Sequence, residues 1–135
     1  RSSDLLFFDI YTSEIKTRSG KYEKDIRPIQ LKISYERKIT SQTLIQQTIK
    51  EWDAQGIQKK GRQAWIKRLE EIWPTVMPGD TLIFEVNTLE ENEFFFNGNS
   101  IGGVEDFEFG ESFLDIWLSP NTTRPKMRRD MIGNY

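Results

Sequence analysis

The residue types that carry most enzymatic chemistry are missing from this chain of 135 residues. It contains no histidine and no cysteine. Without histidine the chain lacks the commonest general base and metal ligand, and a Ser-His-Asp triad is excluded. Without cysteine there is neither a disulfide nor a thiolate metal site. The sequence therefore predicts no metal centre and no cofactor.

Three pairs of neighbouring carboxylates remain as candidates for acid–base catalysis: Glu70–Glu71, Glu90–Glu91 and Glu105–Asp106. Adjacent residues rarely face each other, and these pairs fall at predicted helix ends or in loops. Solvated surface charge is therefore the prediction. The glycines of segment 98–103 lack the Lys-Ser/Thr pair of a phosphate loop and follow a hairpin signal, so they indicate a turn.

Two other polar segments have alternative interpretations. Tyr11-Thr12-Ser13 interrupts an apolar run. These side chains either satisfy structural hydrogen bonds or form a polar patch inside a cleft. The basic segment 124–129 (RPKMRR) is expected to be a solvated tail that complements the end of the preceding helix, and the alternative is attraction of an acidic partner.

Composition limits the possible partners. The 21 acidic and 19 basic residues give a formal net charge of −2, which gives no reason to expect a nucleic acid or an anionic membrane as partner. No apolar run approaches the roughly 20 residues of a membrane-spanning helix, so the chain is not expected to be transmembrane. The length fits a single domain over residues 1–135.

The apolar pattern predicts an antiparallel sheet. In segment 28–35 every second residue is apolar, which is typical of a half-buried strand. Further strands are expected at 5–15, 81–87, 94–96 and 100–104. Asn97-Gly98 is a strong signal for a two-residue hairpin between the last two.

Three helices are predicted beside the sheet. The first is capped by Thr40 and ends at Gly56, and the second begins at about Gln58 or Arg62 and ends at Trp73. The third runs from the cap Asp106 to about Leu118. The segment 122–135 is expected to be a short helix or an extended arm. Together these elements predict an α+β domain.

The third helix is apolar on two faces, which indicates burial on two sides. One face holds Phe107, Leu114, Trp117 and Leu118, with Phe113 at its edge, and the other holds Phe109 and Ile116. Either the helix is sandwiched between the sheet and another segment, or its second face lines a ligand cleft.

Several segments together resemble one known family. They are LLFFDIYTSEI (5–15), GKY (20–22), PIQLKISYERKIT (28–40), KEWDAQG (50–56), WPTVMPGDTLIF (73–84), FFFNGNSIGGVEDFEF (94–109) and FLDIWLSPNT (113–122). In order and spacing the chain resembles the bacterial chalcone-isomerase-like domain. The resemblance implies a chalcone isomerase-like open-faced β-sandwich, with helices packed on one face of an antiparallel sheet. It also implies an exported, periplasmic protein from which a signal peptide has been removed.

The resemblance also suggests where a site would lie. Plant chalcone isomerases hold a developing anion with an Arg and orient water and substrate with hydroxyl groups. The strand Thr of that set corresponds to Tyr11, its Tyr and Asn fall near Thr40 and Gln47, and its later Thr falls near Ile116. Arg1 is the only counterpart of the Arg. Because most of these polar groups are replaced, chalcone isomerase activity is not expected.

The resemblance also implies a different function, because some relatives with this fold bind fatty acids instead. We expect non-catalytic binding of a small apolar or fatty-acid-like ligand, whose carboxylate would need an anion-holding group, in a cleft between sheet and helices. The alternative is an isomerase, of the intramolecular lyase type, with an unknown substrate. A third possibility is a periplasmic interaction module without any ligand, and the sequence leaves its protein partner unknown. The candidate ligand-binding residues are Arg1, Tyr11, Ser13, Thr40, Gln47, Phe109 and Ile116.

Overall fold

A computed structural model describes residues 11–133 of the chain. Five strands form one antiparallel sheet, and their order in the sheet is their order along the chain. The strands are β1 (Tyr11–Thr17), β2 (Ile29–Tyr35), β3 (Thr81–Val86), β4 (Asn92–Phe96) and β5 (Asn99–Gly102). The helices are α2 (Ser41–Ala54), α3 (Arg62–Ile72), α4 (Phe107–Leu118) and α5 (Pro125–Ile132).

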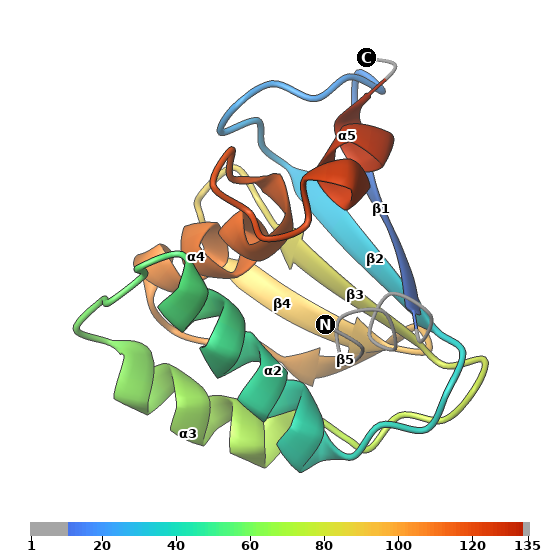
Figure 1. The fold of residues 1–135 in the computed structure, drawn as a ribbon, viewed down its shortest axis with the longest axis vertical. Coiled ribbons are helices and arrows are strands. Elements are labelled where there is room, and N and C mark those ends of the chain that lie inside the picture. The colour runs from blue at the N-terminus through green and yellow to red at the C-terminus, as the bar shows by residue number, and fades with distance from the viewer. Residues whose placement is uncertain (1–10, 134–135) are drawn as a thin grey trace.

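The described helices all cover the same face of the sheet (Figure 1). The alternation predicted for β2 is confirmed, because Ile29, Leu31, Ile33 and Tyr35 are all buried beneath them. The opposite face of the described strands carries charged side chains such as Lys32 and is not covered by a helix. An α+β fold with helices on one face of an open antiparallel sheet is therefore confirmed.

Local signals position the elements as the sequence predicts. Asn97 and Gly98 both have positive φ angles, +48° and +88°, which suit the tight hairpin between β4 and β5. The Thr40 hydroxyl accepts a hydrogen bond from the Thr43 amide at 3.1 Å, and the Asp106 carboxylate accepts one from the Glu108 amide at 2.9 Å. Both predicted helix caps are therefore confirmed.

Helices α2 and α3 form one insertion between two adjacent strands. The chain leaves β2, forms both helices and returns to β3, and the two ends of the insertion are joined by a short antiparallel bridge between Ile39 and Val76. The insertion starts and ends at the same place beside the sheet. As a result α2 lies over the buried face of the sheet (Figure 1), where the Trp52 indole of α2 donates a hydrogen bond to the Ser112 carbonyl of α4 at 3.0 Å.

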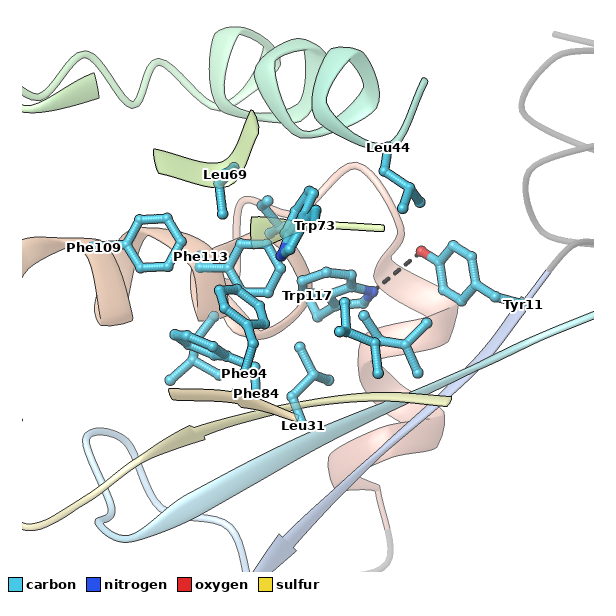
Figure 2. Packing of buried hydrophobic residues seen from close by; sticks show 14 of the residues in the cluster. Tyr11, Leu31, Leu44, Leu69, Trp73, Phe84, Phe94, Phe109, Phe113 and Trp117 are labelled. Carbon is cyan, nitrogen blue, oxygen red and sulfur yellow. Dashed lines mark hydrogen bonds between the residues drawn. The ribbon is translucent and has the colours of Figure 1, made fainter. Parts of the chain in front are cut away.

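Aromatic rings fill the space between sheet and helices. Phe113 of α4 lies at the centre, with its ring centroid 4.9 Å from that of Phe84 on β3, 5.4 Å from that of Phe94 on β4 and 5.2 Å from that of Trp117. Phe109 stacks on Phe113 at 5.6 Å (Figure 2). These contacts fix the position of α4 relative to β3 and β4.

The prediction for α4 is partly confirmed. Phe109 and Ile116 on one face and Leu114, Trp117 and Leu118 on the other are all buried, so the helix is covered on two sides. Phe107 was expected to share this burial, and that expectation is wrong because 70% of its surface is exposed. Periodicity assumes that the partner surface continues under every turn, whereas the buried part of α4 begins at Phe109.

The first strand and the C-terminal tail were also among the predicted elements. The described part of the first strand runs from Tyr11 to Thr17, two residues beyond its predicted end, and the predicted residues 5–10 lie outside the described part. The tail forms the short helix α5, one of its two predicted alternatives, and lies beside β1 (Figure 1). Between residues 11 and 133 no helix combines the length and apolar character needed to cross a bilayer.

Candidate functional site

A small cavity lies between the sheet and the helices, at the place where the sequence suggests a cleft. Its volume is about 40 Å³, and it brings together three of the predicted ligand-binding residues, Tyr11, Gln47 and Ile116. The rest of its wall comes from β2, β3, α2, α4 and the end of α3: Ile33, Tyr35, Leu44, Thr48, Glu51, Trp73, Leu82, Phe113 and Trp117. We call this space the Tyr11 cavity.

Tyr11 enters the cavity from the inward face of β1. It lies opposite Tyr35 in the sheet register, with ring centroids 6.1 Å apart, and its hydroxyl accepts a hydrogen bond from Trp117 Nε1 at 3.2 Å (Figure 2). Burial raises the pKa of the Tyr11 phenol to about 12, against an opposing effect of nearby Arg124. Burial also raises the pKa of Tyr35. Both phenols therefore stay neutral at physiological pH and are poor proton acceptors.

Trp73 lines the cavity and carries a buried hydrogen-bond donor that has no acceptor within residues 11–133. It is the residue that ends α3, directly before Pro74, and only 6% of its surface is exposed. Its indole Nε1 has no hydrogen-bond acceptor among the described residues. The neighbouring rings of Phe94 and Phe113 offer at most a weak aromatic acceptor. An unpaired buried donor is rare in folded proteins, and this one belongs to a residue that lines a cavity.

A buried ion pair lies beside the cavity. Glu51 of α2 lines it, and Glu51 Oε2 lies 3.0 Å from Arg124 Nη2, with only 9% and 4% of the two side chains exposed. The Thr123 hydroxyl donates to Glu51 Oε1 at 2.6 Å. The expectation that the whole basic segment is a solvated tail is therefore wrong for Arg124. The reason is the Thr122 hydroxyl, which donates to the Ile116 carbonyl and turns the chain back under α2.

The remaining predicted residues do not line the Tyr11 cavity. The Ser13 hydroxyl donates to Met131 Sδ at 3.3 Å and so connects β1 with α5. Thr40 is occupied as the cap of α2. Phe109 packs among Trp52, Trp65 and Phe84. Arg1 lies outside the described residues.

Trp73, Glu51 and Arg124 are site residues that the sequence analysis missed. For Glu51 a signal exists, because it follows Leu44 by seven residues and Thr48 by three and so belongs to the buried stripe of α2. A carboxylate in that stripe indicates a buried cation partner. No local signal points to Trp73 or Arg124, since their roles depend on contacts between distant segments.

A larger hollow of about 1250 Å³ lies at the other end of the sheet, between α3 and the β3–β4 side, and its rim is acidic. Its inner polar groups are already bonded. The Asn92 side chain donates to the Val104 carbonyl and accepts from the Val104 amide, and Arg68 Nε donates to the Gly103 carbonyl at 2.9 Å. These contacts hold the segment between β5 and α4. Among the described residues, no group of acidic side chains is arranged to hold a metal ion.

Asp115 of α4 lies outside the Tyr11 cavity, and its pKa is shifted toward neutrality. Burial is the main cause, and Glu111 and Asp25 add to it, so the pKa rises from 3.8 to about 6. A carboxyl whose pKa is higher in the folded than in the unfolded state favours folding only while it is protonated. Stability is therefore lost as the pH rises from about 4 to about 6.

Replacing Asp115 by asparagine should remove this pH dependence. We expect Asp115→Asn to be more stable than the wild type by about 1 kcal/mol at about pH 7.5, after allowance for solvent screening of a half-buried group. The difference should vanish near about pH 3, where the wild-type carboxyl is protonated in the folded and in the unfolded state. Thermal unfolding at both pH values measures the effect, with the exposed Asp130→Asn as control. An equal difference at both pH values would contradict the assignment.

Comparison with known proteins agrees with the fold and the order of its elements. The chalcone isomerase-like family matches residues 6–133. An uncharacterised protein of Haemophilus influenzae is 27% identical over 126 residues, which cover 93% of this chain and 62% of that protein. The chain thus spans less than two thirds of the length of this relative. Since the family match includes every described strand and helix, the chain belongs to the chalcone isomerase-like family.

Proposed function

We propose that this protein binds a small ligand with an apolar body and a hydrogen-bond-accepting head in the Tyr11 cavity, without converting it chemically. A fatty-acid-like molecule fits this description. The observation that carries the proposal is Trp73, which lines the cavity and whose buried indole N–H has no acceptor among the described residues. A carbonyl or carboxylate oxygen of a ligand would supply that acceptor.

The rest of the wall suits an apolar body. Leu44, Leu82, Phe113 and Ile116 offer aliphatic and aromatic surface, and the Tyr11 hydroxyl adds a second polar group. Arg124 lies near enough to Tyr11 to lower the pKa of its phenol, so its positive charge also favours an anionic head. Arg124 already pairs with Glu51, so a ligand carboxylate would compete with the Glu51 carboxylate for the Arg124 guanidinium.

The cavity volume limits how such a ligand is held. About 40 Å³ has room for one or two water molecules, whereas an engineered cavity that binds benzene measures about 150 Å³. A head group or a terminal methyl group fits, and a whole chain does not. Binding of a longer ligand therefore requires outward movement of wall residues, and α2 contributes four of them: Leu44, Gln47, Thr48 and Glu51.

Isomerase chemistry receives less support from the same cavity. Proton transfer needs a group that titrates near the working pH. The two phenols at the wall, Tyr11 and Tyr35, both have raised pKa values. The carboxyl with a pKa near 6, Asp115, belongs to a different part of the molecule.

Ligand binding can be tested with a blocked variant and a matched control. Gently purified protein is extracted and analysed for lipids by mass spectrometry, and the delipidated protein is titrated with octanoic, lauric and palmitic acid in thermal-shift experiments. We expect a bound acid or a saturable rise in the unfolding temperature. Gln47→Trp should fill the cavity mouth and abolish the rise, whereas Gln46→Trp, on the exposed side of the same helix, should retain it.

The role of Trp73 has its own test. Trp73→Phe removes the N–H and retains an aromatic ring, and it should weaken binding of a fatty acid about tenfold, the equivalent of one hydrogen bond to a charged group. An absence of any bound acid, together with no thermal shift for any of the three acids, would refute the proposed function.

A further inference from the structure

A second cavity lies on a different face of α4 from the Tyr11 cavity. It measures about 300 Å³ and is formed by three segments that are distant in sequence: the β1–β2 loop, α4 with the turn after it, and α5. Its apolar wall includes Ile29, Leu114 and Leu118, and its polar groups come from all three segments. An apolar wall with a few converging polar groups is typical of small-molecule sites, and the volume lies at the lower end of their range.

Arg128 of α5 is held in place with part of its guanidinium unused. Its Nε donates to the Leu118 carbonyl at 2.8 Å, at the end of α4. Its two terminal nitrogens have no hydrogen-bond or ion-pair partner among the described residues, although Arg128 lines the cavity. A guanidinium that is fixed through Nε and free at its other end is prepared to bind a carboxylate.

Asp115 presents an unpaired carboxylate to the same cavity. Its side chain accepts no hydrogen bond and forms no ion pair within the described residues, although it is partly buried. Tyr22 also lines the cavity, and its hydroxyl forms no hydrogen bond in the described part of the chain. The pKa of Tyr22 is raised mainly by burial; Arg128 lowers it and Asp115 raises it, so both charges act on this hydroxyl. Asp115 and Arg128 therefore lie at one site without being paired to each other.

The charges around the cavity balance. Three cationic and three acidic side chains line it, so it favours neither a free anion nor a free cation: Lys24, Arg27, Arg128, Asp25, Glu111 and Asp115. One cation is already used, because Arg27 Nε lies 2.9 Å from Glu90 Oε2 and its Nη1 donates to the Ile26 carbonyl. Lys24, Asp25 and Glu111 are exposed to solvent, so the partly buried groups left for a ligand are the free end of Arg128, the carboxylate of Asp115 and the Tyr22 hydroxyl.

We propose that this cavity binds a small zwitterion of the α-amino acid type, with its carboxylate on Arg128 and its ammonium group on Asp115. A zwitterion satisfies both unpaired charges at once and leaves the net charge of the site unchanged. A phosphate or a dicarboxylate would meet three acidic side chains, and a simple amine would leave Arg128 unpaired. The site is separate from the Tyr11 cavity and does not depend on the function proposed for that cavity.

The test uses matched probes that carry one charge or both. The ¹⁵N-labelled chain is titrated with L-alanine, L-serine and L-leucine, and in parallel with propionate and ethylamine, and amide shifts are followed by NMR. We expect saturable shifts at Tyr22, at Leu114 to Ser119 and at Arg128 with the amino acids. Propionate and ethylamine should bind at least about tenfold more weakly, since each lacks one of the two contacts.

Variants on the same helices separate binding from folding. Asp115→Asn and Arg128→Lys should each weaken amino acid binding about tenfold or more, because the first removes the anion and the second removes the planar donor pair. Asp130→Asn and Arg129→Lys, both exposed on α5, should leave the affinity unchanged. The amide NMR spectrum of each ¹⁵N-labelled variant reports whether the variant is folded.

The pH dependence gives a further readout. The charged groups that act on Asp115 come from its own helix, from the β1–β2 loop and from the α2–α3 connection: Glu111, Asp25, Lys24 and Lys59. Protonation of Asp115 removes the partner of the ammonium group, so affinity for the amino acids should fall as the pH is lowered through about 6. Recognition of the ammonium group would be refuted if propionate bound as tightly as the amino acids and if its binding became tighter at low pH. No saturable shift with any probe would refute the site.

Discussion

Replacing Phe113 by alanine should lower the free energy of unfolding by about 4 kcal/mol. Its ring lies among those of Phe84, Phe94, Phe109 and Trp117, and only 1% of its surface is exposed. Truncation removes the buried apolar surface of the ring and leaves a cavity that a close-packed core cannot close. Denaturant unfolding measures the loss as a lower midpoint with an unchanged slope.

Phe107 supplies the matched control, because it belongs to the same helix and is 70% exposed. Phe107→Ala should change the stability by no more than about 0.5 kcal/mol. Phe113 also lines the Tyr11 cavity, so its truncation adds the space of a ring to about 40 Å³. Benzene should therefore raise the unfolding temperature of Phe113→Ala and leave that of the wild type unchanged. A loss below about 1.5 kcal/mol would show that the aromatic cluster is not the main core.

Replacing Glu51 by alanine should cost about 3 kcal/mol, because it removes the acidic half of a buried ion pair with Arg124. The hydrogen bond from the Thr123 hydroxyl is lost as well. The double replacement Glu51→Leu with Arg124→Met should recover most of the loss, since an apolar pair of similar volume avoids the desolvation of two charges. A double-mutant cycle in denaturant gives the coupling energy between the two side chains.

The pair between Asp53 of α2 and Arg62 of α3 serves as the control, because its carboxylate is exposed. Asp53 Oδ1 lies 2.9 Å from Arg62 Nη1, but more than half of the Asp53 side chain is exposed. Asp53→Ala should cost less than about 1 kcal/mol. If the double replacement at Glu51 and Arg124 were as unstable as Glu51→Ala alone, the loss would come from packing around α2, and the broken ion pair would not be its cause.

The features that local sequence encodes were predictable. The alternation in β2, the caps at Thr40 and Asp106 and the hairpin at Asn97-Gly98 depend on residues within a few positions of each other, and all are confirmed. The resemblance to a known family added that the helices pack on one face of the sheet, which periodicity alone leaves open.

The candidate sites were harder to predict because they depend on contacts between distant segments. Tyr11, Gln47 and Ile116 come together only because α2 and α4 pack over β1 and β2. The burial of Arg124 depends on a hydrogen bond back to α4, and the basic pattern of its segment indicated the opposite. Likewise, the exposure of Phe107 depends on where the partner surface ends, which a helical stripe does not encode.

The distribution of aromatic rings along the chain also determines when the protein can fold. The central rings of the core belong to β3, β4 and α4, which lie close together between residues 81 and 118. Contacts at such short separation form quickly. During synthesis, however, this segment emerges after β1, β2, α2 and α3. The first 80 residues therefore expose half of a hydrophobic interface until the last third of the chain is made, and this interval is when the protein is most open to aggregation.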